Sequence, residues 1–166
     1  LVIGIASSAE QARIIYARLL AVIKSSRRLA REFRRMTDTR GIHSIHNCRY
    51  EIKPSKSAAV QGLDLNTGII DELHLTDPEL WDDMVNGPSA QRSALVAGFT
   101  TAGDDTSKLL IQLYAKAEDG TGGEQFGFFI WEAPESRIPD DDETLGRYLC
   151  AASPGLACGR LDLQTA

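Results

Sequence analysis

The stretch "NTGIIDELHL", residues 66–75, joins an apolar run to two adjacent carboxylates. Residues 68–70, Gly-Ile-Ile, are typical of a buried strand because they are apolar and rich in β-branched side chains. Asp71 and Glu72 follow at once. Acidic groups are rarely placed at the end of a buried strand unless something there needs them. The stretch therefore raises the question of a functional site at this strand end.

Strand-like and helix-like segments alternate on both sides of this stretch. This alternation predicts an α/β domain with a mostly parallel sheet flanked by helices. In such a sheet, functional residues gather beyond the carboxyl ends of the strands, so the stretches after residues 6, 70 and 99 should lie side by side. Strands are expected at 1–6, 67–73, 93–99 and 126–133, with two short ones within 39–54, and helices at 7–24, 25–36, 77–87, 106–118 and 144–153.

Capping residues locate the starts of two of these helices. Ser7, followed by Glu10 three residues later, forms a capping-box pattern. Asp77 before Pro78 is typical of an N-cap followed by proline at the first helical position. In the last expected strand, the aromatic residues Phe128, Phe129 and Trp131 are expected to fill the sheet.

The charge is unevenly distributed along the chain. Residues 1–50 carry ten Lys/Arg against three Asp/Glu, whereas the whole chain of 166 residues has a net charge of -5. In the expected helix 25–36, one face is basic, which is compatible either with a polyanionic partner or with a solvated helix surface. That face consists of Arg27, Arg31, Arg34 and Arg35.

Length and composition fit one domain with a sizeable core, since 43% of the residues are hydrophobic. No run approaches the roughly 20 apolar residues of a membrane span. The chain opens with Leu1 on a strand-like run and has no signal peptide pattern, so it is expected to be a piece of a longer protein. Its three cysteines form no CxxC pair, and a reducing cytoplasm is the simplest setting.

Two other clusters resemble metal sites only superficially. His43, His46 and Cys48 have a loosely zinc-like spacing, but a second ligand cluster is missing from the sequence. The run 140–143, Asp-Asp-Asp-Glu, lies on an expected linker where consecutive acids point in different directions. A solvated or helix-capping role is favoured for this run.

An apolar strand that ends in Asp-Glu is the arrangement called Walker B. Mg²⁺ takes oxygen ligands and keeps several waters, so Asp71 alone can hold it directly or through water. Glu72, at the point where the strand gives way to a loop, can polarise an attacking water. By itself the pattern is also compatible with an exposed turn in which Asp71 has a capping role.

Neighbouring motifs add to this pattern. The segment "QGLDLNTGIIDELH", followed by "SALVAGFTTAGDD", resembles the ATPase domain of large terminase subunits, the motors that package phage DNA. The early "ASSAEQAR" and the late "LCAASPGLACG" are similar to two further segments of that family. The resemblance covers roughly residues 1–160 and leaves 161–166 as a C-terminal tail.

The resemblance implies a P-loop NTPase-like fold of the ASCE type and a role for each matched residue. Asp71 matches the magnesium-side acid and Glu72 the catalytic glutamate. Thr100, Thr101 and Gly103 match the coupling motif that senses the γ-phosphate, while His74 receives no chemical role. The family implies ATP, Mg²⁺ and double-stranded DNA, a small subunit, a portal protein and a homo-oligomeric ring. It further implies no membrane and a cytoplasmic location in an infected or lysogenic bacterium.

The sequence departs from the family in one respect. A phosphate-cradling loop of the form GxxxxGK[ST] is missing from it, so the expected fold lacks its N-terminal phosphate-loop unit. The family's C-terminal nuclease domain is missing as well. The chain alone is therefore expected not to hydrolyse ATP efficiently. Two alternatives stay open: a non-catalytic α/β module for subunit interaction or DNA contact, and a helicase-like motor core.

Overall fold

The structure, a computed structural model, describes residues 1–6, 8–37, 41–55, 60–86 and 94–161. The chain divides into two compact units, Leu1–Lys116 and Ala117–Ala166. The sheet, the expected Walker B residues and the expected coupling motif all belong to the first unit.

The first unit is built on one six-stranded sheet with the order β2-β3-β4-β1-β5-β6. Strands β4, β1, β5 and β6 run parallel, while β2 and β3 pair antiparallel at one end. This confirms the α/β class and the mostly parallel sheet. The strands are β1 (Val2–Ala6), β2 (Phe33–Thr37), β3 (Gly41–Ser44), β4 (Arg49–Pro54), β5 (Thr67–Asp71) and β6 (Leu95–Phe99).

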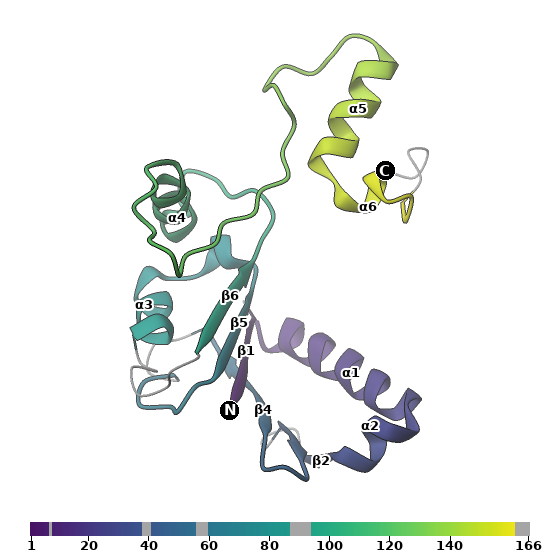
Figure 1. Cartoon of the computed structure of the whole chain (residues 1–166), viewed down its shortest axis with the longest axis vertical. Coiled ribbons are helices and arrows are strands. Elements are labelled where there is room, and N and C mark those ends of the chain that lie inside the picture. The colour runs from purple at the N-terminus through teal and green to yellow at the C-terminus, as the bar shows by residue number, and fades with distance from the viewer. Residues whose placement is uncertain (7, 38–40, 56–59, 87–93, 162–166) are drawn as a thin grey trace. The chain divides into compact units, whose positions relative to one another are not determined.

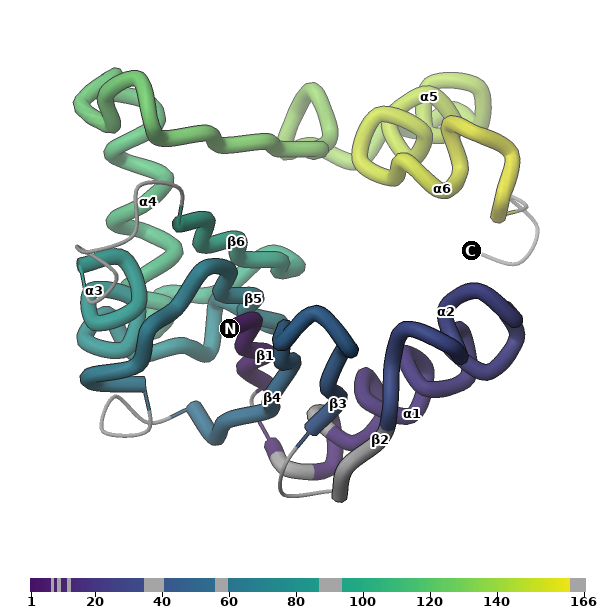
Figure 2. Tube along the Cα trace, turned by 60° about the horizontal axis from the view of Figure 1, so that its bottom comes forward, coloured from purple at the N-terminus to yellow at the C-terminus, as the bar shows by residue number. Residues whose placement is uncertain are grey.

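Helices flank this sheet on both sides. Helix α1 lies on one side, and α3 and α4 lie on the other (Figures 1 and 2). A short 3-10 turn, η2, follows β5 directly and leads toward α3. The bounds are α1 (Ala9–Ser25), α2 (Arg27–Glu32), η2 (Leu73–Leu75), α3 (Pro78–Asn86) and α4 (Lys108–Glu118).

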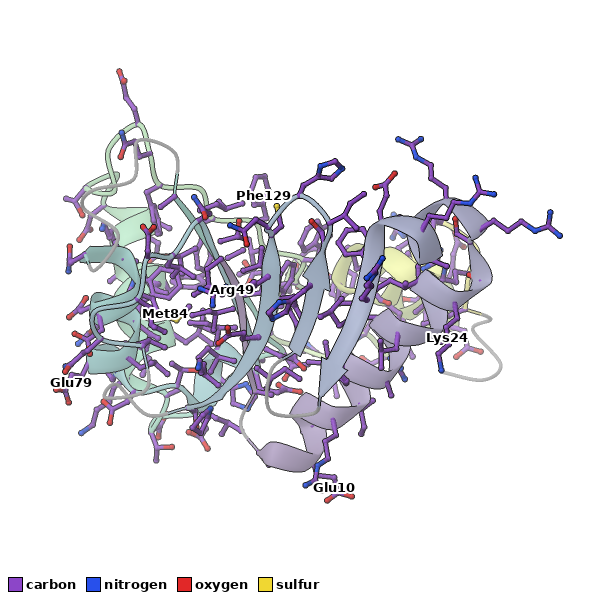
Figure 3. All side chains as sticks on the ribbon, turned by 90° about the horizontal axis from the view of Figure 1, so that it is seen from below. Glu10, Lys24, Arg49, Glu79, Met84 and Phe129 are labelled. Carbon is purple, nitrogen blue, oxygen red and sulfur yellow. The ribbon has the colours of Figure 1, made fainter. Side chains whose placement is uncertain are left out.

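The core between the sheet and α3 fixes the position of β5. Ile70, Leu80 and Met84 are at most 1% exposed. A Cβ at Gly68 would overlap the end of the Met84 side chain, so the glycine lets α3 approach the strand closely. Met84 points from α3 toward the sheet, whereas Glu79 projects into solvent (Figure 3). Because α3 packs closely against β5, the position of Asp71 at the end of the strand is fixed.

The other face of the sheet has its own apolar cluster beneath α1. Tyr16 and Ile23 of α1 are buried against Ile42 of β3. The Tyr16 hydroxyl also donates a hydrogen bond of 3.2 Å to the carbonyl oxygen of Gly41. This contact ties α1 to the antiparallel end of the sheet.

The expected helix 25–36 is wrong in its last four residues, 33–36. The helix ends at Glu32, and Phe33 begins β2, which pairs with β3. Sheet pairing outweighs the helical pattern here, because propensity is weak beside tertiary contacts. Arg34 and Arg35 therefore lie on β2 and not on the helix, so the four arginines do not form one helical face.

The start of α1 is one residue later than the capping box predicts. Ser8 is the N-cap, and its Oγ accepts a hydrogen bond of 3.1 Å from the backbone N–H of Gln11. Ser7, for which the capping role was expected, lies outside the described residues. The expected helix start at Pro78 is confirmed, since α3 begins there.

The second unit contains α5 (Asp142–Ala152) and α6 (Pro154–Ala157). Asp141 caps α5 by accepting a hydrogen bond of 2.8 Å from the N–H of Thr144, which confirms the capping role expected for the acidic run. The expected strand 126–133 is wrong, because these residues form no ladder and Phe129 and Trp131 are 82% and 58% exposed. Strand propensity alone does not order a strand without a paired neighbour.

Candidate functional site

The carboxyl ends of β1, β5 and β6 meet at one edge of the sheet. β5 lies between the other two strands, with Ile5 paired to Ile70 and Phe99 paired to Asp71. The residues that follow each strand therefore emerge side by side, as the sequence predicts. Asp71 is the last residue of β5 and Thr100 is the first after β6, which brings two groups of candidate site residues together.

The backbone turns sharply at Glu72. This residue has φ 56° and ψ 54°, the left-handed region that non-glycine residues rarely adopt. Its N–H donates a hydrogen bond of 3.2 Å to Oδ1 of Asp71, and both side chains are partly exposed. A glutamate in this conformation costs about 1 kcal/mol, and such strain is concentrated at functional sites. The geometry therefore favours a functional role for Glu72 over an ordinary exposed turn.

This strain makes a testable prediction about stability. Among the described residues, the other non-glycine position with positive φ is Asn47, at 63°. Asparagine tolerates the left-handed region better than glutamate. We expect Glu72→Asn to raise the free energy of unfolding of this chain by up to about 1 kcal/mol, and the reverse change Asn47→Glu to lower it by a similar amount. Urea unfolding measures both, and destabilisation by Glu72→Asn would contradict the strain assignment.

His74 connects Glu72 to the loop after β6. The imidazole Nδ1 lies 2.8 Å from Thr100 Oγ1 and 3.4 Å from Glu72 Oε2. The backbone N–H of His74 also donates to Thr100 Oγ1 at 3.2 Å. The Thr100 hydroxyl in turn lies 2.8 Å from the carbonyl oxygen of Thr101, to which it donates. Side chains from the two strand ends therefore meet at His74, which is hydrogen-bonded to Thr100 and in close contact with the Glu72 carboxylate.

Gly103 packs where a side chain would not fit. A Cβ there would collide with the Ser107 side chain and would lie 3.2 Å from Cβ of His74. The loop then closes at Asp104, whose Oδ1 accepts hydrogen bonds of 2.8 Å from the N–H and 2.6 Å from the hydroxyl of Thr106. The hydroxyl of Thr106 and then its N–H, by donating these bonds, lower the pKa of Asp104 below its ordinary value. The coupling-motif segment is therefore a defined turn.

The residues present fit part of a magnesium–nucleotide site. Asp71 offers one partly exposed carboxylate at the sheet edge, as suits an ion that keeps waters and also binds phosphate. Among the described residues there is no group of three His, Cys, Asp or Glu side chains that could enclose a metal, so neither an all-protein cage nor a zinc site at His43, His46 and Cys48 is formed there. A phosphate-cradling loop is missing from the sequence, so the triphosphate-binding part is not supplied by the residues seen.

The sequence predicts Asp71, Glu72, Thr100, Thr101 and Gly103 as site residues and gives no role to His74. The structure brings all of these stretches to the same edge of the sheet. The sequence did contain one signal for His74: it lies two positions after Glu72, on the first turn beyond β5. Its partner could not be inferred, because the contact with Thr100 depends on the parallel pairing of β5 with β6.

No protein-family model matches the sequence, and no curated protein is similar to it by sequence. The fold, in contrast, is similar to that of solved structures. The crystal structure of the HK97 bacteriophage large terminase matches with a TM-score of 0.78 and 19% identity over 99% of this chain. The large terminase ATPase domain of Thermus phage P74-26, in a mutant form, matches 63% of this chain with a TM-score of 0.46 and 16% identity.

These matches cover the known proteins only in part. The chain spans 34% of the length of the HK97 protein and 50% of that of the P74-26 domain. Within the part of the chain that the structure describes, no helix combines the length and the apolar character needed to cross a membrane. The match to the HK97 protein extends over essentially the whole chain, so the resemblance predicted from the sequence is confirmed at the level of the fold: the chain shares the fold of part of this large terminase.

Proposed function

We propose that this chain is the middle part of the ATPase motor domain of a phage or prophage terminase large subunit. The motor would couple hydrolysis of ATP with Mg²⁺ to the packaging of double-stranded DNA. The observation that carries the proposal is the strained Glu72, which follows Asp71 at the carboxyl edge of β5 and is joined through His74 to the loop after β6. The terminase-like fold around this site supports it.

Each site residue has a role that follows from its position. Asp71 would bind Mg²⁺, either directly or through water, because its carboxylate is at the sheet edge and only partly buried. Glu72 would orient and polarise the attacking water as a general base. Thr100, Thr101 and Gly103 form the exposed turn beside it and would contact the terminal phosphate of the nucleotide. Bound ATP would supply the phosphoryl group, and Mg²⁺ would neutralise the charge that develops on it.

The working motor would have further partners. On this proposal they are double-stranded DNA, a terminase small subunit and a portal protein, with several copies of the large subunit forming a ring in the host cytoplasm. The residues that cradle the phosphates would belong to a part of the subunit outside this sequence. This chain alone is therefore expected to be inactive.

The proposal is tested with the complete subunit, purified with and without double-stranded DNA. We expect ATP hydrolysis that requires Mg²⁺ and rises when DNA is added. Asp71→Asn should remove most of this activity, because a neutral amide binds Mg²⁺ weakly. Asp82→Asn, on an exposed position of α3, is the matched control. Hydrolysis by Asp71→Asn at the rate of the control would contradict the proposed site.

A second candidate function is a DNA-contact module without catalysis, and the arginines of α2 and β2 favour it. Arg27, Arg31 and Arg34 are exposed, whereas Arg28 forms an ion pair of 3.4 Å with Glu32. Long, nitrogen-tipped side chains extend from this part of the unit into solvent (Figure 3). Solvated guanidinium groups of this kind can contact DNA phosphates without base recognition.

Salt dependence tests this contact. If the three arginines contact phosphates, the variant Arg27→Ala/Arg31→Ala/Arg34→Ala should bind duplex DNA more weakly. The slope of log K against log salt should fall by about 0.9 for each lost contact. The control variant, Arg137→Ala/Arg147→Ala/Arg160→Ala, removes the same charge from the second unit. Equal slopes for the two variants would exclude a specific phosphate contact at α2 and β2.

A further inference from the structure

We propose that His74 is a positioning residue whose imidazole contacts both the Glu72 carboxylate and the Thr100 hydroxyl and holds them as one unit. Through this unit, a change in the position of Glu72 is transmitted to the loop 100–107. The inference rests on the proposed function, because it assigns the coupling between hydrolysis and the loop to a particular side chain. It goes beyond that function because it assigns a role to a residue for which sequence reasoning had none.

The direction of each hydrogen bond follows from counting protons. A threonine hydroxyl has one hydrogen, and that of Thr100 is donated to the carbonyl oxygen of Thr101 at 2.8 Å. With its hydrogen on that carbonyl, Thr100 Oγ1 accepts from the backbone N–H and from the Nδ1 of His74. We assign the imidazole proton to Nδ1 in this arrangement, because a carboxylate oxygen of Glu72 lies 3.4 Å from the same nitrogen. The carboxylate therefore contacts the N–H that Thr100 accepts.

The position of the His74 ring is fixed by its surroundings. Leu73 is only 5% exposed and packs over Gly98 of β6, where a Cβ would collide with it. The turn is closed by hydrogen bonds from the N–H of Leu75 to the carbonyl oxygen of Glu72 and from the N–H of Thr76 to that of Leu73, at 2.9 and 3.0 Å. The His74 side chain, at 19% exposure, is therefore held against β6 rather than free to rotate into solvent.

Contacts on the far side of His74 extend to the middle of the loop. Cβ of His74 lies beside Gly103, at a position where a larger residue would displace it. Ser107, which is 3% exposed, accepts a hydrogen bond of 3.1 Å from the N–H of Asp104 and so anchors the end of the same turn. A movement of Glu72 toward a bound water would remove the contact of its carboxylate with the His74 imidazole, which changes the restraint on this loop.

The geometry is tested without any nucleotide by ¹⁵N NMR of the imidazole of His74 in this chain. At a pH where the ring is neutral, we expect the proton on Nδ1, the nitrogen that faces Thr100. Thr100→Val keeps the shape of the side chain but removes the hydroxyl, and it should shift the population toward the tautomer protonated on Nε2. A neutral ring protonated mainly on Nε2 in the unmodified chain would overturn the assignment.

The coupling is tested in the complete subunit by measuring ATP hydrolysis with and without DNA. His74→Ala should reduce the stimulation by DNA about tenfold, with a smaller change in KM than in kcat. His74→Asn places an amide N–H near the position of Nδ1 and should restore much of the stimulation, whereas His74→Gln should not. His46→Ala, in the exposed turn between β3 and β4, is the control.

The outcomes separate this inference from the proposed function. Full DNA stimulation in His74→Ala, together with loss of hydrolysis in Glu72→Gln, would overturn the role of His74 and leave the motor function intact. Hydrolysis that survives Glu72→Gln would instead contradict the proposed function. Equal stimulation in His74→Asn and His74→Gln would also overturn the inference, because it would show that the position of the N–H does not matter.

Discussion

Glu72→Gln in the complete subunit is expected to lower kcat for ATP hydrolysis by about 10²–10⁴-fold. The amide is nearly isosteric with the carboxylate but cannot accept a proton from the attacking water. Nucleotide binding should persist, because Asp71 and the rest of the site are unchanged. Hydrolysis measured at saturating ATP with Mg²⁺, beside direct nucleotide binding, separates the two effects.

A matched control makes this experiment specific. Glu79→Gln makes the same chemical change in the first turn of α3, where the side chain is exposed. This variant should hydrolyse ATP at the normal rate. If Glu72→Gln does so too, the Walker B assignment is wrong and Asp71-Glu72 is a structural turn. This chain alone, without the remainder of the subunit, should show no ATP hydrolysis, whether residue 72 is Glu or Gln.

Gly41→Ala is expected to destabilise the first unit by about 2–4 kcal/mol. Gly41 has φ +71°, which alanine adopts only with strain, and its Cβ would collide with the backbone carbonyl oxygen of Tyr50 on β4. A backbone atom in a paired strand cannot move aside as a flexible side chain can. The strand pair β3–β4 and the Tyr16 hydrogen bond to Gly41 would both be disturbed.

Gly62 provides the control for this prediction. It has nearly the same φ, +73°, but no described atom lies within 4 Å of the position of its Cβ. Gly62→Ala should therefore show the conformational strain alone, about 1 kcal/mol. Urea unfolding followed by Trp81 fluorescence, in a Trp131→Phe background, reports on the first unit. Equal losses of stability for the two variants would show that the close approach to Tyr50 costs nothing.

Several features of the fold could be predicted because they depend on local pattern. The apolar run before Asp71 is a strand, Pro78 begins a helix, and the alternation of segments gives the mostly parallel sheet. Asp71, Glu72 and Thr100 could be placed at one edge, because parallel strands end at the same side of a sheet. Two expected elements were wrong for the opposite reason. Residues 33–36 and 126–133 form a strand only if a partner strand is available, and their local pattern does not show whether one is.

By itself, the sequence determined the class of fold, the strand that leads to the two acids and the residue types available for magnesium and proton chemistry. These follow from hydrophobic periodicity, capping signals and the chemistry of the side chains. Only the tertiary structure decided the left-handed backbone of Glu72 and the contact of His74 with Thr100. The contact depends on the pairing of β5 with β6, which places residues 26 positions apart within hydrogen-bonding distance, and no local pattern specifies such a pairing.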